Sequence, residues 1–163
     1  MILRAPNNIA VAMVLTLLSA MVLCSSHAQA AEYMSLAKDE ARMRYGPSTD
    51  HPIKWVYQQK GWPFEVRARF DQWAKVRDIN GEEGWIHRSL LSTRDFALIQ
   101  ANNERNYVIL RKKKNPESAG VVRLEDDSLV RVHECSELYC KVGIAGYRGF
   151  LEKKVLWGVA QDK

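Results

Sequence analysis

The sequence predicts an all-β protein in which two tandem small β-barrels follow an N-terminal signal peptide. Three observations support this fold class: an internal repeat, apolar residues that alternate at period 2 between closely spaced turns, and a leading apolar segment typical of exported proteins. Short strands with turns this close together favour a small, strongly bent barrel over a flat sheet.

The internal repeat relates residues 64–91 to residues 130–156. An offset of 66 positions (132 minus 66) aligns Val66 with Val132, Trp73 with Tyr139, Lys75 with Lys141, and Val76 with Val142. A period near 65 is longer than the roughly 20–50 residues of most solenoid repeats. Each copy is therefore interpreted as a small domain rather than as one layer of a stack.

Residues 1–30 have the three parts of a cleaved export signal. Arg4 supplies a positive charge, and residues 9–23 are almost wholly apolar. Residues 28–30, Ala-Gln-Ala, fit a cleavage site with small residues before Ala31. A transmembrane anchor is the alternative, but an apolar run of about 15 residues is shorter than the ~20 that span a bilayer. We therefore expect a periplasmic or secreted protein.

Lipid attachment at Cys24 is a second alternative, which Leu23 disfavours because a small residue is usual at that position. After signal cleavage we expect no transmembrane segment. Cleavage removes one of the 24 basic and none of the 19 acidic residues, so 23 basic residues face 19 acidic ones, a net charge of +4. That charge supports only weak attraction to anionic surfaces. Nucleic acid is not expected as a partner outside the cytoplasm.

The first unit, residues 34–93, shows a series of short strands separated by turn residues. We expect strands at 41–44, 54–57, 64–70, 73–78 and 85–87. In the third of these, four apolar residues on one face alternate with three charged residues on the other. Asp71-Gln72 and Asn80-Gly81 mark tight turns, and Ser89-Leu90-Leu91 closes the unit. Residues 31–37 are expected to be a short lead-in.

The second unit, residues 105–160, repeats this plan with different loops. Its expected strands are 107–111, 120–124, 129–135, 138–142 and 148–152, and residues 112–119 form a long loop. Residues 92–104 are interpreted as a linker between the units. Its apolar Phe96, Leu98 and Ile99 suggest that it packs against the domains instead of moving freely.

Short stretches in both units share the pattern of a known family. In the first unit they are residues 43–49, 54–57, 63–66, 77–78 and 84–87; in the second they are residues 135, 139–142, 146–150 and 156–159. Together, over roughly residues 38–160, they resemble the bacterial SH3-like domains of exported proteins. The resemblance implies a small β-barrel, binding to cell-wall material or to proteins, and no catalysis. The second unit departs from the family's Arg-x-Gly-Pro-Ser loop at Arg111–Pro116, so functions of that loop are not carried over to it.

Cys135 and Cys140 are predicted to form a disulfide. If Glu137-Leu138 is a two-residue hairpin turn, the two cysteines lie opposite each other with closely spaced Cα atoms. An even pair of cysteines in an exported chain agrees with this pairing. Zinc is the alternative, because His133 shares a face with Cys135, but a structural zinc needs four ligands. We expect no metal and no cofactor.

No pattern in the sequence predicts an enzyme. Nucleophilic catalysis by a cysteine needs a histidine base and an orienting partner, whereas His51, His87 and His133 are scattered over loops and strands. Related exported cell-wall hydrolases carry a separate catalytic domain, for which residues 31–163 leave no room. We expect no catalytic residues.

Two groups of residues are candidates for ligand binding. The run Arg111-Lys112-Lys113-Lys114 is the densest charge cluster. A solvated loop is the simpler explanation, and an anion-binding loop formed by Lys112, Lys113 and Lys114 is the alternative. Tyr45 and Trp62 lie in turns where a ligand could reach an aromatic groove of the kind that binds extended peptides. The alternative for these two is packing, because a small barrel relies on large side chains for burial.

The sequence thus favours a non-catalytic exported binding module at the cell envelope that recognises peptidoglycan peptide or glycan. The alternative is a periplasmic protein–protein adaptor or scaffold. The partner is therefore either a cell-wall component or an envelope protein.

The signal interpretation makes a direct prediction. The exported protein is expected to begin near Ala31, because the Ala-Gln-Ala sequence precedes that residue. Intact-mass spectrometry of the exported protein measures its N-terminus. A retained Met1 contradicts the prediction.

Overall fold

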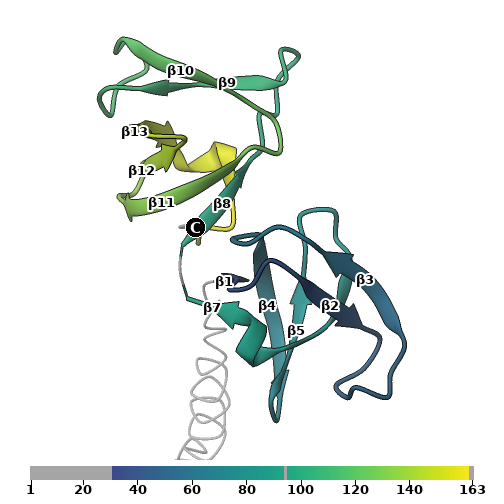
Figure 1. Cartoon of the computed structure of the whole chain (residues 1–163). Coiled ribbons are helices and arrows are strands. Elements are labelled where there is room, and N and C mark those ends of the chain that lie inside the picture. Colours follow the sequence, from purple (N-terminus) through teal and green to yellow (C-terminus); the bar gives the residue numbers. More distant parts are fainter. Residues whose placement is uncertain (1–30, 94, 162–163) are drawn as a thin grey trace, which may run out of the picture.

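The computed structural model describes residues 31–93 and 95–161, which form two β-barrels in succession along the chain (Figure 1). The first is a seven-stranded antiparallel sheet of order β3-β2-β6-β5-β4-β1-β7. Its elements are β1 (Glu32–Leu36), β2 (Ala41–Arg44), β3 (Ile53–Tyr57), β4 (Pro63–Phe70), β5 (Trp73–Arg77), β6 (Glu83–His87), the 3-10 helix η1 (Arg88–Leu90) and β7 (Leu91–Ser92).

The second barrel repeats this topology in the order β10-β9-β13-β12-β11-β8-β14. Its elements are β8 (Phe96–Ile99), β9 (Tyr107–Arg111), β10 (Gly120–Glu125), β11 (Leu129–Cys135), β12 (Tyr139–Ile144), β13 (Tyr147–Glu152), η2 (Lys153–Val155) and β14 (Leu156–Trp157). The predicted all-β fold with two tandem barrels is confirmed.

Each barrel has its own core, because alternate side chains of its strands point inward. The first core contains Leu36, Met43, Phe64, Val76 and Ile86. The second contains Ile99, Leu110, Val130, Val142 and Leu156. All ten are almost completely buried, so the repeat seen in the sequence is a repeat of inward-facing positions.

Two segments differ from the sequence interpretation. Residues 31–37, expected as a lead-in, contain strand β1, which pairs with β4 and β7. Residues 92–104, expected as a linker, contain strand β8, which pairs with β11 and β14. Each strand is short and takes its partners from distant parts of the chain, so no local alternation marks it. The expectation that the apolar residues of 92–104 pack inward holds, since Leu98 and Ile99 are fully buried.

Asp78 organises the turn between β5 and β6. It is buried, and its Oδ1 accepts hydrogen bonds from the backbone N–H groups of Asn80 and Glu82 at 3.0 and 2.8 Å. Its Oδ2 accepts the hydroxyl of Tyr57 at 2.8 Å. Burial, together with the hydrogen bond to Asp78, raises the pKa of Tyr57. The carboxylate thereby ties strand β3 to the opposite turn of the barrel.

The two barrels touch through β1 and β4 of the first and β8 and β14 of the second. The rings of Tyr33 and Trp157 meet edge to face, with centroids 5.6 Å apart. Gly158, at φ +110°, lies so close to the first barrel that a Cβ there would come within 2.8 Å of the Pro63 Cβ. The Phe96 ring likewise packs against Gly61. These contacts hold the barrels in one arrangement.

The predicted hairpin between β11 and β12 is confirmed. Cys135 lies opposite Cys140 in the register, and the two are joined by a disulfide with Cα atoms 4.0 Å apart. The Ser136 N–H donates to the Tyr139 carbonyl at 2.8 Å inside the turn. The Cys140 side chain is fully buried in the second core.

Between residues 31 and 161, leaving out residue 94, no helix is long and apolar enough to cross a membrane. The predicted signal peptide, residues 1–30, lies outside the described residues.

The disulfide gives a stability prediction. Replacing Cys135 and Cys140 with Ser is expected to lower the free energy of unfolding by about 2 kcal/mol, the chain-entropy value for so short a loop. That loss lowers the melting temperature of the second barrel by roughly 8–16 °C, at 4–8 °C per kcal/mol for a domain of this size. Calorimetry of both proteins measures the change. An unchanged melting temperature, or two free thiols in the native protein, contradicts it.

Candidate functional site

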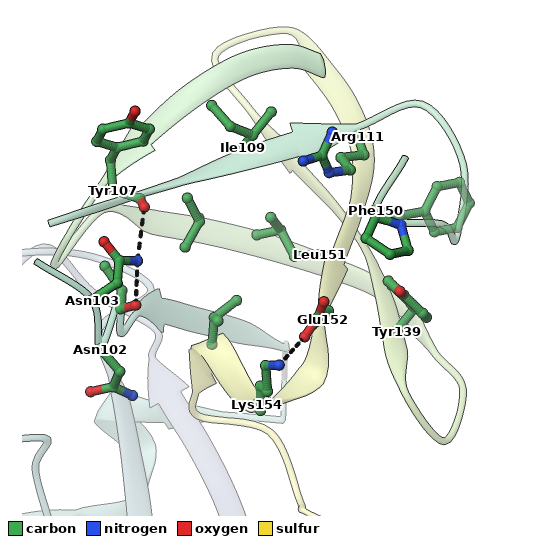
Figure 2. Close-up of a pocket in the computed structure, with 14 residues that line it drawn as sticks. Asn102, Asn103, Tyr107, Ile109, Arg111, Tyr139, Phe150, Leu151, Glu152 and Lys154 are labelled. Atoms are coloured by element: carbon green, nitrogen blue, oxygen red, sulfur yellow. Dashed lines mark hydrogen bonds and ion pairs between the residues drawn. The ribbon is translucent and has the colours of Figure 1, made fainter. Parts of the chain in front are cut away.

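The second barrel contains a groove of about 540 Å³ between strands β9 and β13 on one side and the end of η2 on the other. Figure 2 shows Tyr107 at one end of this groove and Tyr139 and Phe150 at the opposite end. Ile109 and Leu151 form its apolar floor. We call this cavity the second-barrel groove.

The polar walls of the second-barrel groove are held by specific hydrogen bonds. The Asn103 side-chain amide donates to the carbonyl oxygens of Ala101 and Tyr107, at 2.6 and 3.1 Å (Figure 2). Arg111 donates from Nη1 to the Ser118 carbonyl at 2.7 Å, which fixes the guanidinium beside the loop 112–119. The backbone therefore positions both polar side chains before any ligand arrives.

An ion pair lies on the η2 side of the groove. Lys154 Nζ is 2.5 Å from Glu152 Oε2 (Figure 2). The hydrogen bond to Glu152 raises the pKa of Lys154. The ammonium is largely exposed, so the pair adds little to stability. It is an exposed, charged feature that a polar ligand could reach.

The first barrel forms an equivalent but smaller groove of about 240 Å³. Arg44 pairs with Trp85 as Arg111 pairs with Phe150 in the second barrel. Trp73 pairs with His87 as Tyr139 pairs with Glu152. Arg44, Trp73 and His87 therefore line the first groove at the positions where Arg111, Tyr139 and Glu152 line the second. Trp85, which is equivalent to Phe150, does not line the first groove.

The first-barrel groove is narrower, and Trp73 and His87 pack against each other at its wall. Their rings meet edge to face with centroids 5.3 Å apart. The His87 Nδ1 is hydrogen-bonded to the Ser89 hydroxyl at 2.8 Å. Arg44 donates to the His51 carbonyl at 2.6 Å, much as Arg111 donates within its own loop.

The predicted lysines lie on the loop that borders the second-barrel groove. Lys114 places its Nζ 5.6 Å from the centroid of the Phe150 ring, at the aromatic end of the groove. Lys112 and Lys113 are exposed on the same loop. The loop is ordered by its own hydrogen bonds, from the Lys113 N–H to the Ser118 hydroxyl and from the Glu117 N–H to the Asn115 side chain. Of the three lysines, the structure brings only Lys114 next to a groove-lining side chain.

Tyr45 and Trp62, predicted as an aromatic site, do not line a common cavity among those of the described residues. Tyr45 is exposed beside Lys54, whose Nζ is 5.8 Å from the ring centroid. Trp62 is half-buried against Tyr57, and its indole Nε1 is buried without a hydrogen-bond partner. It borders a separate cavity of about 380 Å³ with Gln58, Gln59 and Val56.

The sequence analysis missed the residues that line the second-barrel groove. These are Tyr107, Ile109, Tyr139, Phe150 and Glu152; Arg111, which also lines the groove, is the first residue of the predicted basic run. A signal for one of them was present: the internal repeat aligns Trp73 with Tyr139, two aromatic residues at the start of equivalent strands. The remainder could not be separated from core or surface positions by pattern alone.

The described part of the chain contains no group of three His, Cys, Asp or Glu residues that could hold a metal ion. Cys135 and Cys140 are bonded to each other, so neither is available as a nucleophile. The arrangement offers aromatic surfaces, an arginine and an ion pair, which are means of binding.

Residues 37–93 and 104–158 both match the family model for the bacterial SH3 domain. The chain belongs to the bacterial SH3 domain family. Both matched segments of this bacterial SH3 protein are SH3 domains, and neither is a catalytic domain. No curated protein sequence matches it significantly.

Two solved structures from Trichomonas vaginalis are similar to this chain. NlpC2 is 12% identical, with a TM-score of 0.35, over 78% of this chain and 48% of its own. NlpC1 is 14% identical, with a TM-score of 0.36, over 81% of this chain and 47% of its own. This chain thus spans about half the length of these two structures.

The stability of Trp62 variants tests whether this side chain packs in the first barrel. Trp62→Phe is expected to change the free energy of unfolding by less than about 1 kcal/mol, because it removes a buried N–H that has no partner. Trp62→Ala is expected to cost about 2–4 kcal/mol, because it leaves a cavity beside Tyr57. Urea denaturation measures both variants, and equal losses for Phe and Ala contradict the packing assignment.

Proposed function

We propose that this bacterial SH3 protein is an exported, non-catalytic binding module of the cell envelope that recognises peptidoglycan peptide or glycan. The observation that carries the proposal is that both barrels form a groove from equivalent positions. A feature built twice from different residues, Tyr139 and Glu152 in one barrel and Trp73 and His87 in the other, is better explained by binding than by accidental packing.

The chemistry of the second-barrel groove suits a cell-wall peptide. Such peptides carry both amine and carboxylate groups on short side chains. Arg111 can pair with a carboxylate through its planar guanidinium, and Glu152 can accept an amine in place of Lys154. Tyr107, Tyr139 and Phe150 supply large contact area at little cost in conformational entropy.

A periplasmic or secreted location is proposed on two grounds. Residues 1–30 have the pattern of an export signal. The Cys135–Cys140 disulfide persists in an oxidising compartment but is rare in the cytosol.

A periplasmic protein adaptor is the second candidate function. The observation that favours it is the exposed basic loop with Lys112, Lys113 and Lys114, which an acidic protein surface could contact without entering the groove. Rim charges of this kind act mainly on the association rate and lose strength in salt.

Sedimentation of the purified protein with cell-wall sacculi tests the proposal. Tyr139→Ala is expected to weaken sacculus binding at least ~10-fold, because an aromatic at the groove wall is the type of residue that dominates binding energy. Tyr147→Ala is the matched control, since Tyr147 is exposed at the β12–β13 turn and does not line the groove. Equal binding by both variants and the wild type contradicts the groove as the binding site.

The salt dependence of sacculus binding distinguishes the basic loop from the groove as the contact surface. Changing Lys112, Lys113 and Lys114 to Gln is expected to leave sacculus binding within about threefold of wild type, because none of the three lysines lines the groove. If the triple variant abolishes binding and wild-type binding disappears between ~50 and ~300 mM salt, the basic loop is the contact and the groove is not. Tyr45→Ala in the same assay is expected to bind normally.

A further inference from the structure

Strand β3 forms an edge of the first sheet and exposes three apolar side chains. It lies at the end of the strand order, and in the described residues it pairs only with β2. Ile53, Trp55 and Val56 are 43%, 51% and 46% exposed. Because successive side chains of a strand point to opposite faces, apolar surface is open on both faces of this edge.

The corresponding edge strand of the second barrel, β10, carries an exposed charged side chain. Strand β10 of the second barrel is equivalent to β3. At one equivalent position, β3 carries Val56, which pairs with Arg42 of β2, and β10 carries Arg123, which pairs with Ile109 of β9. Arg123 is ion-paired with Glu125 at 2.9 Å, and its guanidinium stands 4.9 Å from the Tyr107 ring centroid. Charged side chains on an edge strand oppose the addition of another strand. The edge of β10 has this protection at the position where β3 carries a valine.

The single cation of β3 is already engaged within the barrel. Lys54 Nζ is 2.8 Å from Glu82 Oε2 and donates to the Glu83 carbonyl at 2.9 Å. The ammonium is therefore drawn toward the β5–β6 turn of its own barrel. The Lys54 side chain is only 23% exposed, against 58% for the ion-paired Arg123, so it opposes an incoming strand less than Arg123 does.

We propose that β3 is a docking edge for the β3 of a second copy of this chain, which joins two first barrels through antiparallel strand pairing. Pairing centred on Trp55 sets the two Trp55 residues opposite each other and sets Lys54 opposite Val56. No cation then faces a cation, so the strand is complementary to itself. A symmetric contact of this type closes after two copies and does not continue into a fibre.

The placement of β3 leaves room for a second copy. It lies on the side of the first barrel turned away from the second barrel (Figure 1). Two chains can therefore meet at this edge while their second barrels stay apart. The dimer displays four grooves, and linked sites of this kind raise the overall affinity for a repeating polymer.

The size of the contact sets its strength. Large aromatic side chains bury about 150–250 Å² each, so a half-exposed Trp55 with Ile53 and Val56 offers on the order of 200 Å² per copy before main-chain contacts are added. Stable interfaces bury about 800 Å² per partner. The dimer is therefore weak, forming at high micromolar protein concentration.

Sedimentation velocity of the purified protein from ~10 to ~1000 μM measures the association. Wild-type protein is expected to pass from monomer to dimer over this range. Val56→Arg, which gives β3 the residue found at the same position of β10, is expected to stay monomeric throughout. Arg123→Lys is the matched control on the other edge and is expected to dimerise as wild type does. Circular dichroism and the melting temperature verify that each variant is folded.

Ile53→Lys provides a second variant that places a charge on the same edge, and it is also expected to remain monomeric. Raising the salt concentration is expected to preserve or increase the dimer fraction, because the contact is apolar and both copies are positively charged. Wild-type protein that remains monomeric at ~1000 μM, or a dimer that survives both charged variants, overturns the proposal. Binding of Val56→Arg to sacculi at low concentration separates this inference from the proposed groove function, since the groove is unchanged.

Discussion

Pairing between the first and last strands of each unit is the constraint on which both barrels depend. β1 pairs with β7 through Leu36 and Leu91, and β8 pairs with β14 through Ile99 and Leu156. All four side chains are buried in the cores. A domain of this size buries only about 60% of the surface of its unfolded chain, so an open barrel would expose most of its small core. Closure also positions the 3-10 helix before each last strand, because the residue after the first strand donates a backbone hydrogen bond to that helix. Ala37 N–H donates to the Leu90 carbonyl in the first barrel, and Gln100 N–H donates to the Val155 carbonyl in the second.

The same closing strands bring the two barrels together. β7 ends at Ser92 and β8 begins at Phe96, so the chain passes from the closing strand of one barrel directly into the first strand of the next. Phe96 then packs on Gly61, and Gly158 after β14 approaches Pro63 too closely for any side chain. The result is a pair of barrels held in contact, which differs from two domains on a flexible tether.

Duplication has left one architecture with two different grooves. The register places Trp73 and His87 of the first barrel where the second has Tyr139 and Glu152. The indole and imidazole rings pack together beside the first groove, whereas Glu152 pairs with Lys154 beside the second, and the second groove is the larger. The edge strands of the two barrels also differ: β3 carries Val56 at the position where β10 carries Arg123. Equivalent backbone positions thus carry different chemistry in the two barrels.

The sequence by itself determined the fold class, the tandem arrangement and the disulfide, because each depends on neighbours in the chain. Alternation in Phe64–Phe70 marks one strand, and the five-residue separation of Cys135 and Cys140 marks a hairpin. Strands β1 and β8 were missed because their partners, Ser92 and Leu156 among them, lie far along the chain. Only the tertiary structure decided the groove: Tyr107, Tyr139 and Phe150 come from three different strands and meet when the barrel closes. The tertiary structure also showed that Tyr45 is exposed whereas Trp62 packs against Tyr57. Burial of a side chain depends on which strands pack over it, and the neighbouring residues in the sequence do not determine that.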